Sequence, residues 1–465
     1  MSEAELCYAD IADLSHRLRN RELSPIELTR AFLDRISSLD SSLHAYATVL
    51  TKEALDDARR AEAELNRGVW RGPMHGVPVA VKDLCFTKGI RTTCGMWIYR
   101  DFRPGYDATA VTRLRNAGAV LLGKLQLTEG GWIRNHPQFP TPLNPWDADR
   151  WTGASSNGPA TATAAGICTA SIGSDSGGSI RFPCAMNGLT GIKPTWGRVS
   201  LHGVFAFAPS MDHLGPIARS AEDAGHVLQV IAGGDPNDPM SLCAPVPDFV
   251  CSEPSVRGLR IGLDPNAALK AVEAEVASVV EGVARTLESL GADICRVQMP
   301  PSEILSAGFG SYSSAEAAVV HEATFPARAA EYGPFLQSFL EQGQMVSGME
   351  MARLERERLT YSGALEKLFE DIDILLIPVL PTTGRELTPN LDVPKELIGS
   401  FTSFTTPFNF SGNPTITMPG GSAADGISIA IQLVAPRLGE RRLITAGRAF
   451  QSATDWHLAR PSFQE

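Results

Sequence analysis

The residues with the clearest chemistry are one lysine and two loops that carry serines. Lys82 follows the apolar run Val77–Val81, and the serines lie in residues 153–158 (GASSNG) and 173–181 (GSDSGGSIR). A serine hydroxyl attacks a carbonyl carbon when a nearby base takes its proton, and backbone N–H groups stabilise the oxyanion that forms. These residue types therefore point to hydrolysis by acyl transfer, in segments that contain no histidine.

The second serine loop joins flexible backbone to a predicted helix start. Gly177 and Gly178 let the chain approach a ligand closely and align successive N–H groups. If a helix begins at Ile180, these groups stand at its positive end, where an oxyanion is stabilised. An ordinary glycine-rich turn or an anion-binding loop has the same composition, so both alternatives remain open.

Lys82 and the first serine loop each have a structural and a catalytic interpretation. Desolvation lowers the pKa of a buried lysine, and the neutral amine can act as a base toward a hydroxyl. A lysine at a strand end can instead reach solvent or pair with Asp83. Ser155 and Ser156 can cap the helix that follows, or one of them can relay a proton between two partners.

The elements that must hold these residues are strands and helices in alternation. Ser24 and Pro25 predict the start of the second of two N-terminal amphipathic helices. From residue 259 a strand, a long helix and a strand follow one another, which favours parallel strands with crossover helices. Strands are predicted at Val77–Val81, Ala119–Leu122, Leu259–Leu263, Ile294–Val297 and Ile374–Leu380, and helices at Ala108–Asn116, Ala160–Ala170, Ile180–Met186 and Ala271–Leu290.

The composition excludes several classes of protein. The 465 residues are 43% hydrophobic and 20% charged, as is typical of a globular chain, and the net charge of −11 argues against a nucleic-acid partner. No apolar run approaches the roughly 18 residues of a spanning helix, and the acidic N-terminus gives no signal peptide, so no membrane partner is expected. Eight cysteines without metal-type spacing predict reduced thiols, no metal site and a cytoplasmic location.

Taken together, these segments resemble the amidase signature family of Ser-cisSer-Lys hydrolases. The resemblance covers most of the chain and includes segments beyond the two serine loops. These are residues 72–83 (GPMHGVPVAVKD), 92–95 (TTCG), 123–124 (GK), 144–146 (NPW), 188–194 (GLTGIKP), 406–414 (TPFNFSGNP) and 431–434 (IQLV). The family fold implies one α/β domain over residues 1–465, with the signature core at about 72–220. Its central sheet is mixed and largely parallel, with helices on both faces.

The resemblance also implies a role for each matching residue. Ser179 corresponds to the nucleophile, Ser155 to the serine that follows a cis peptide bond, and Lys82 to the base. The implied oxyanion hole consists of the backbone N–H groups of Ser176, Gly177, Gly178 and Ser179. The implied supporting side chains are Ser156, Asp175 and Arg181. The chain departs from the commonest family sequence at Ala154, Asn157 and Ser176. The Cβ of Ala154 adds crowding next to the expected cis bond.

The expected function is hydrolysis of amide C–N bonds through an acyl-enzyme, without a metal or other cofactor. The expected partner is a small-molecule amide or carbamate, and the expected assembly is a monomer or a homodimer. One alternative is a glutaminase subunit of an amidotransferase assembly, since the family includes such subunits. A second is an amide-binding pseudoenzyme, which is disfavoured because Lys82, Ser155 and Ser179 are all present.

Residues 305–350 predict the type of substrate. This segment is expected to be long and irregular, and it mixes glycines with aromatic residues and methionines, a composition that suits a mobile apolar lid. The same aromatic residues can instead fill an ordinary helical core. Gly130, Gly131 and Trp132 correspond to a family segment near the acyl pocket. The lid interpretation predicts a roomy apolar site for bulky aryl amides, anilides or aryl carbamates, the last being urethanase activity.

Overall fold

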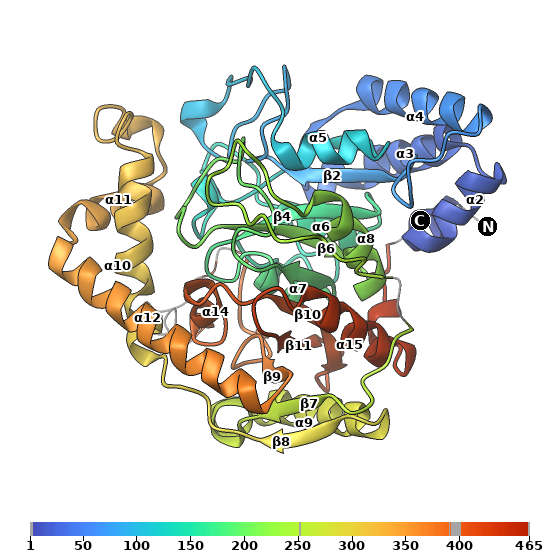
Figure 1. Ribbon diagram of the computed structural model, residues 1–465. Helices are drawn as coiled ribbons and strands as arrows, with labels where there is room; N and C mark the ends of the chain where they lie inside the picture. The colour runs from blue at the N-terminus through green and yellow to red at the C-terminus, as the bar shows by residue number, and fades with distance from the viewer. Residues whose placement is uncertain (1–2, 251–252, 390, 392–400, 464–465) are drawn as a thin grey trace.

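One β-sheet of eleven strands organises the chain (Figure 1). The computed structural model describes residues 3–250, 253–389, 391 and 401–463. In sheet order the strands are β1 (Tyr46–Val49), β3 (Val120–Leu125), β2 (Pro78–Lys82), β4 (Ala170–Asp175), β6 (His213–Ala218), β5 (Thr190–Lys193), β10 (Thr415–Ser422), β11 (Ser428–Val434), β9 (Ile374–Pro378), β7 (Arg260–Leu263) and β8 (Asp293–Arg296).

The sheet is mixed, as predicted, but the expectation that it is largely parallel is wrong. Parallel pairs join β3 to β2, β2 to β4, β9 to β7 and β7 to β8. The other neighbouring pairs are antiparallel, including the whole run from β4 to β9. Antiparallel strands need only short connections, such as the one between β10 and β11, whereas parallel strands need crossovers. The strand–helix–strand pattern after residue 259 correctly predicts the parallel β7–β8 pair but does not represent the centre of the sheet.

Helices cover the sheet on both sides. Helices α6 and α7 contact each other and the central strands, as do α8 and α15 (Figure 1). A third group, α10, α11 and α12, packs together on one side of the molecule (Figure 1). The helices are α1 (Glu3–Cys7), α2 (Ile11–Asn20), α3 (Pro25–Leu43), α4 (Thr51–Asn66), α5 (Thr109–Asn116), α6 (Asn157–Ala164), α7 (Arg181–Asn187), α8 (Ala221–Ile231), α9 (Ala274–Ser289), α10 (Glu303–Val320), α11 (Pro334–Met345), α12 (Gly348–Asp371), α14 (Thr406–Phe410) and α15 (Glu440–Ser452).

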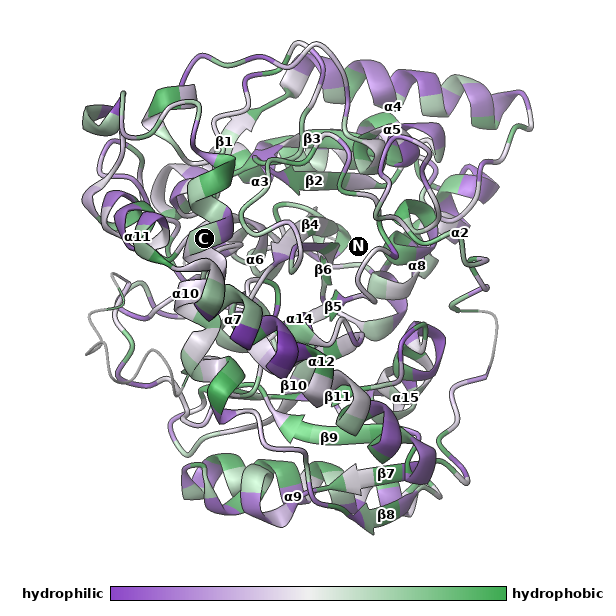
Figure 2. Cartoon of the chain, turned by 60° about the vertical axis from the view of Figure 1, so that its left-hand side comes forward, coloured by the Kyte–Doolittle hydropathy of each residue, from purple (hydrophilic) through white to green (hydrophobic). Residues whose placement is uncertain are grey.

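The hydropathy of each element matches its place in the fold. Strand β9 is apolar along its whole length and fully buried, whereas α4 and α9 alternate between hydrophilic and hydrophobic residues (Figure 2). At the start of α3, Ser24 accepts hydrogen bonds from the N–H groups of Ile26 and Glu27, and Pro25 occupies the first turn, as predicted.

Most predicted boundaries agree with the structure to within three residues, but the helix at Ala160–Ala170 does not. That helix is α6, which begins at Asn157 and ends at Ala164. Pro159 is tolerated because its missing N–H falls in the first turn. Gly166 ends the segment with a φ of +67°, and a Cβ there would lie 2.9 Å from the Tyr8 ring. Only glycine fits this turn, so the chain leaves the helix and enters β4.

Strand β2 brings the site residues to one edge of the sheet. It pairs in parallel with β3 and β4, so the carboxyl ends of all three strands point the same way. Lys82 is the last residue of β2 and Asp175 the last of β4. The glycine-rich loop therefore begins beside Lys82, at the end of parallel strands where ligand sites form in α/β proteins.

Three general features of the described residues bear on function. No helix among them is long and apolar enough to cross a membrane. Within the same residues, no cluster of three or more His, Cys, Asp or Glu side chains is arranged to hold a metal ion. The cysteines of this part of the chain are free thiols, five of them buried.

Candidate active site

Lys82 is fully buried and surrounded by hydroxyl groups. Its Nζ lies 2.7 Å from Ser155 Oγ, 2.9 Å from Ser156 Oγ and 2.8 Å from Ser174 Oγ. Burial lowers the pKa of Lys82 to about 7, although the nearby carboxylates of Asp175 and Asp212 act in the opposite direction. At neutral pH a large share of this side chain is therefore an uncharged amine.

The hydrogen-bond partners of the serine hydroxyls indicate which of them can donate a proton to that amine. Ser156 Oγ donates its proton to the Ser174 carbonyl oxygen at 3.1 Å, so it accepts from Lys82. A neutral amine has two N–H donors and one lone pair, and Ser155 or Ser174 can donate to the lone pair. Lys82 can thus take a proton from Ser155, and Ser156 holds the amine in place.

The first serine loop has the cis peptide bond that the resemblance implies, between Ala154 and Ser155. The extra Cβ of Ala154 is accommodated beside it. Gly153, the preceding residue, has a φ of +87°, and a Cβ there would lie 2.4 Å from Pro183 Cα. Glycine is therefore required at position 153, where the loop crosses closely over α7.

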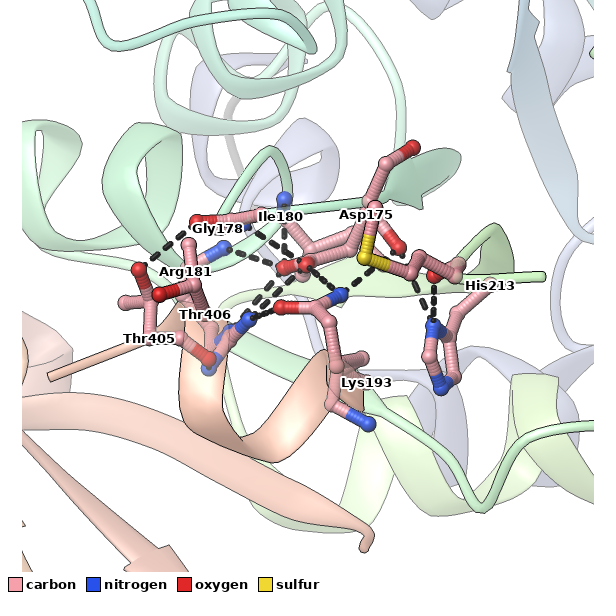
Figure 3. Close-up of polar contacts among 12 residues, drawn as sticks. Asp175, Gly178, Ile180, Arg181, Lys193, His213, Thr405 and Thr406 are labelled. Atoms are coloured by element: carbon pink, nitrogen blue, oxygen red, sulfur yellow. Dashed lines mark hydrogen bonds and ion pairs between the residues drawn. The ribbon is translucent and has the colours of Figure 1, made fainter. Parts of the chain in front are cut away.

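The second serine loop is fastened by the Asp175 carboxylate (Figure 3). The carboxylate accepts hydrogen bonds from the N–H of Gly178 at 2.8 Å and of Ile180 at 3.1 Å, and from Arg181 Nε at 3.0 Å. Burial opposes ionisation of Asp175. The Arg181 charge and the hydrogen bonds outweigh burial, and they hold the pKa of Asp175 well below its usual range. Asp175 therefore acts as a fixed anion that shapes the loop.

This arrangement corrects one residue of the predicted oxyanion hole. The Gly178 N–H points to Asp175 and is not directed toward a substrate. The N–H groups of Ser176, Gly177 and Ser179 donate to no residue that the structure describes. Three of the four predicted donors thus remain available, and Gly178 serves instead to hold the turn.

Side chains far along the sequence complete the support of this loop. Arg181 donates to the Thr405 carbonyl oxygen at 2.8 Å and to Asn409 Oδ1 at 2.5 Å, and Asn409 Nδ2 donates to Asp175 at 2.9 Å. Thr405 Oγ1 donates to the Gly177 carbonyl oxygen at 2.6 Å. Thr405 and Asn409 were not predicted as site residues. The only sequence signal for Asn409 is the family-like segment at residues 406–414, and Thr405 lies just outside that segment.

Asp212 is a further residue that sequence reasoning missed. Its carboxylate accepts from Ser176 Oγ at 2.5 Å and from the N–H groups of Phe207 and Ala208 at 2.8 and 3.0 Å. Burial raises the pKa of Asp212 above its usual value. The Ser176 hydroxyl is thereby turned away from the loop backbone, and the loop is tied to the start of β6.

Ser179 lies where the two serine loops meet. Its carbonyl oxygen accepts from the Ser156 N–H at 3.3 Å. In the described part of the chain no hydrogen bond joins the Ser179 hydroxyl to Ser155, so the second link of the predicted relay is not formed here. Such links often tighten only when a substrate is bound.

Ser179 faces a cavity with aromatic walls, called the aromatic cavity below. Its volume is about 70 Å³, much less than the several hundred cubic ångströms of a typical ligand pocket. The apolar lining agrees with the prediction, but the expected roominess is wrong for this conformation. The walls are Gly131, Trp132, Ile133, Trp151, Ala154, Ser176, Gly177, Ser179, Phe182, Phe207, Phe309, Leu391, Phe401 and Thr402.

Of the three residues predicted to contact substrate, two line the aromatic cavity and one does not. Gly131 and Trp132 line the aromatic cavity. Gly130 is not among the residues that line it, and a Cβ at Gly130 would lie 3.0 Å from the Leu336 side chain of α11. Trp132 stacks on Phe339 of α11 with ring centroids 3.8 Å apart. The glycine pair therefore makes room for α11 as well as for a ligand.

Residues 305–350 are mostly helical, so the predicted irregular segment is wrong. They form most of α10, all of α11 and the start of α12. Both interpretations of the aromatic residues apply in part. Phe309 lines the aromatic cavity, and Phe339 stacks on Trp132, which is part of its wall. The other buried aromatic residues fill the helical layer. These others are Tyr312, Phe325 and Tyr332.

Comparison with known proteins agrees with this fold. Residues 27–444 match the family model Amidase. The chain is 43% identical to the putative amidase AmiD of Mycobacterium tuberculosis over 463 residues, which are 99% of this chain and 97% of that protein. It is 36% identical to a glutamyl-tRNA(Gln) amidotransferase subunit of Geobacter sp. (strain M21), over 96% of this chain and 98% of that one.

The solved structure of a bacterial aryl acylamidase of the amidase signature family aligns with a TM-score of 0.85 and 25% identity. The alignment covers 98% of this chain and 99% of that one. The mixed sheet and its serine–lysine site thus define a class of α/β hydrolases that act on the C–N bonds of amides. The chain belongs to the amidase signature family.

Proposed function

We propose that the protein hydrolyses amides through a covalent acyl-enzyme on Ser179. The observation that carries this proposal is the buried amine of Lys82, 2.7 Å from the Ser155 hydroxyl, beside a loop with unused N–H donors. Ser155 passes the Ser179 proton to neutral Lys82 as Ser179 Oγ attacks the carbonyl carbon. The N–H groups of Ser176, Gly177 and Ser179 stabilise the oxyanion.

The second half of the reaction reverses the proton path. Protonated Lys82 returns the proton through Ser155 to the leaving nitrogen, the C–N bond breaks and the amine departs. A water molecule then attacks the acyl-enzyme, gives a proton to the same relay and releases the acid as Ser179 regains its proton. No step of this sequence uses a cofactor. We propose that the chain acts in the cytoplasm as a monomer or homodimer.

The substrates we propose are amides that carry an aromatic group, including anilides, and aryl carbamates, which react through the same tetrahedral chemistry. Support comes from the aromatic walls around Ser179 and from the family likeness to an aryl acylamidase. We propose that residues 72–220 supply the catalytic groups of a single domain and that residues 305–350 supply part of its substrate wall, through Phe309. The aromatic wall must shift to admit a ring, because the cavity volume is about 70 Å³.

The relatives that are amidotransferase subunits support a second candidate, a glutaminase subunit. Glutamine has no ring for the aromatic cavity, so an aromatic substrate is favoured. The test is a turnover screen of the purified protein on acetanilide, a phenyl carbamate, acetamide and glutamine. Higher kcat/KM for the two aromatic compounds supports the aryl preference, and higher kcat/KM for glutamine supports the glutaminase. Failure of all four substrates and of labelling by a serine-directed phosphonate indicates an amide-binding pseudoenzyme.

A further inference from the structure

A second cavity adjoins the aromatic cavity. Its volume is about 370 Å³, and Ile133 and Trp151 belong to the walls of both cavities. Gly153 lines the second cavity, and the next residue, Ala154, lines the first. The second cavity therefore lies next to the space in front of Ser179, and an arm of a substrate enters it by passing Ile133 or Trp151.

The second cavity differs from the first in its chemistry, and it is called the polar cavity below. Apolar side chains share its wall with charged groups, amides and hydroxyls. The polar side chains of the wall are those of Thr128, Glu129, Arg134, Asn135, His136, Thr141, Thr152 and Asn157. An arm of the substrate that enters this cavity is therefore selected by its polar groups.

Glu129 is an acidic residue of this wall, and it is only 3% exposed. Its Oε1 accepts a hydrogen bond from the Gly333 N–H at 2.8 Å, at the start of α11. Its Oε2 accepts no hydrogen bond from the residues that the structure describes. Because Glu129 lines the cavity and is otherwise nearly closed to solvent, a ligand that supplies an N–H group or a cation to Oε2 gains a charge-assisted hydrogen bond.

The neighbouring polar groups of the cavity already have partners. Asn157 Nδ2 donates to Asn135 Oδ1 at 2.8 Å, and Asn135 Nδ2 donates to the Leu127 carbonyl oxygen at 3.0 Å. The Arg134 guanidinium lies 3.9 Å from the centre of the Phe335 ring. These groups shape the cavity, whereas Glu129 has an acceptor to spare.

The ionisation of Glu129 agrees with a cationic ligand. Burial raises the pKa of Glu129 to about 7, and the Gly333 N–H only partly opposes this effect. A bound ammonium group favours the carboxylate form and adds a charge-assisted hydrogen bond. Without a ligand, burial therefore favours the neutral acid form of Glu129, and a bound ammonium group shifts the side chain toward the carboxylate.

We propose that the polar cavity is a subsite for a protonated primary amine on one arm of the substrate, with Glu129 as its acceptor. This inference rests on the proposed function and narrows it. The preferred substrate has an aromatic group for the aromatic cavity, a scissile amide at Ser179 and an aliphatic arm that ends in an ammonium group. Glu129 then determines specificity by touching the end of that arm.

The experiment uses two matched pairs of substrates, because either side of the scissile bond can carry the arm. One pair is N-(4-aminobutyl)benzamide and N-pentylbenzamide, and the other is 5-aminopentanoyl anilide and hexanoyl anilide. Each pair differs only in an ammonium or a methyl group at the end of the arm. In at least one pair, kcat/KM for the ammonium compound should exceed that for the methyl compound by about tenfold or more.

The variants test whether Glu129 is the cause. Glu129→Gln keeps a carbonyl oxygen for the Gly333 N–H and removes the charge, so the ratio within the responsive pair should fall to about one. Glu341→Gln removes a charge from the exposed side of α11, the helix that begins next to Gly333, and should leave the ratio unchanged. A ratio that persists in Glu129→Gln overturns the proposal. If Glu129→Gln does not fold, the ratio of the wild-type protein decides alone, and a ratio below about tenfold in both pairs overturns the proposal.

Binding measurements distinguish the ammonium subsite from the proposed hydrolase activity. The dissociation constants of the same four compounds are measured by calorimetry on the Ser179→Ala variant, which needs no turnover. If the wild-type protein hydrolyses none of them but the variant still binds an ammonium compound about tenfold more tightly, the subsite stands and the hydrolase proposal fails. If hydrolysis proceeds without any preference for the ammonium arm, the hydrolase stands and the subsite is refuted.

Discussion

Lys82 Nζ and Ser155 Oγ lie 2.7 Å apart in a place that is almost closed to solvent, since Lys82 is 0% and Ser155 2% exposed. The same burial that brings the two groups into contact lowers the pKa of Lys82 to about 7. A lysine in water is charged at neutral pH and cannot accept a proton. The burial of this contact therefore allows Lys82 to act as a base toward Ser155.

The first prediction concerns pH. Because the free enzyme must hold Lys82 as a neutral amine, kcat/KM should rise with pH and reach half of its plateau near pH 7. Lys82→Arg keeps a positive charge at every accessible pH and should lose activity by about a thousandfold or more. The measurement is kcat/KM of both proteins from pH 5 to 9. A profile of the wild-type protein that is flat across this range contradicts the role of Lys82.

The second prediction concerns the nucleophile. Ser179→Ala should abolish turnover and labelling by a serine-directed phosphonate, with a change in unfolding free energy within about 0.5 kcal/mol, since the hydroxyl has no hydrogen-bond partner among the described residues. Labelled peptides are identified by mass spectrometry. Ser38→Ala, at an exposed position of α3, is the control and should keep both properties. Labelling of Ser179→Ala at another serine assigns the nucleophile elsewhere.

The sequence alone predicts the proposed catalytic cluster better than its surroundings. Lys82, Ser155 and the Asp175 loop fall in contiguous motifs that resemble the amidase signature family, whereas the residues alone left a turn, a helix cap and a surface lysine as alternatives. The N–H of Gly178 could not be assigned, because its direction depends on the side chain of Asp175 three residues earlier. Thr405 escaped notice because its role arises only from the tertiary fold.

The third prediction tests the support of the glycine-rich loop. Asn409→Ala removes a donor to Asp175 and an acceptor for Arg181, two buried charged groups. The unfolding free energy should fall by about 2–3 kcal/mol, as expected for hydrogen bonds to charged groups. Because the loop carries the proposed oxyanion donors, kcat should fall more than KM changes. Chemical denaturation and steady-state kinetics measure the two effects.

A matched control separates the loop from general stability. Asn413 donates from Nδ2 to the Ala435 carbonyl oxygen at 2.9 Å, away from the loop. Asn413→Ala should also lower stability, by about 1–2 kcal/mol, but should leave kcat within about twofold. Equal losses of kcat in Asn409→Ala and Asn413→Ala at comparable stability show that Asn409 has no special influence on the loop.

The fourth prediction concerns Gly153. Gly153→Ala places a Cβ 2.4 Å from Pro183 Cα at a φ of +87°, so the loop before Ser155 must shift. Gly68→Ala is the matched control, because its φ is +79° and nothing lies within 4 Å of the added Cβ. The control should cost about 1 kcal/mol for its backbone conformation and keep full activity. Gly153→Ala should cost more and lose most activity; equal stability and activity in the two variants contradicts the close packing.

The last prediction concerns the size of the acyl group. Phe309 of α10 rests on the glycine-rich loop, since a Cβ at Gly177 would lie 2.4 Å from Phe309 Cζ. The ring fills space beside the predicted oxyanion donors, and Phe309→Ala should enlarge the aromatic cavity there. The ratio of kcat/KM for a naphthoyl anilide to that for acetanilide should rise by about tenfold or more. Phe325→Ala, a buried site in the same helical layer outside the cavity walls, should lose similar stability, about 3 kcal/mol, without a change in this ratio. A ratio that stays constant in Phe309→Ala, or rises equally in Phe325→Ala, shows that Phe309 does not limit the acyl group.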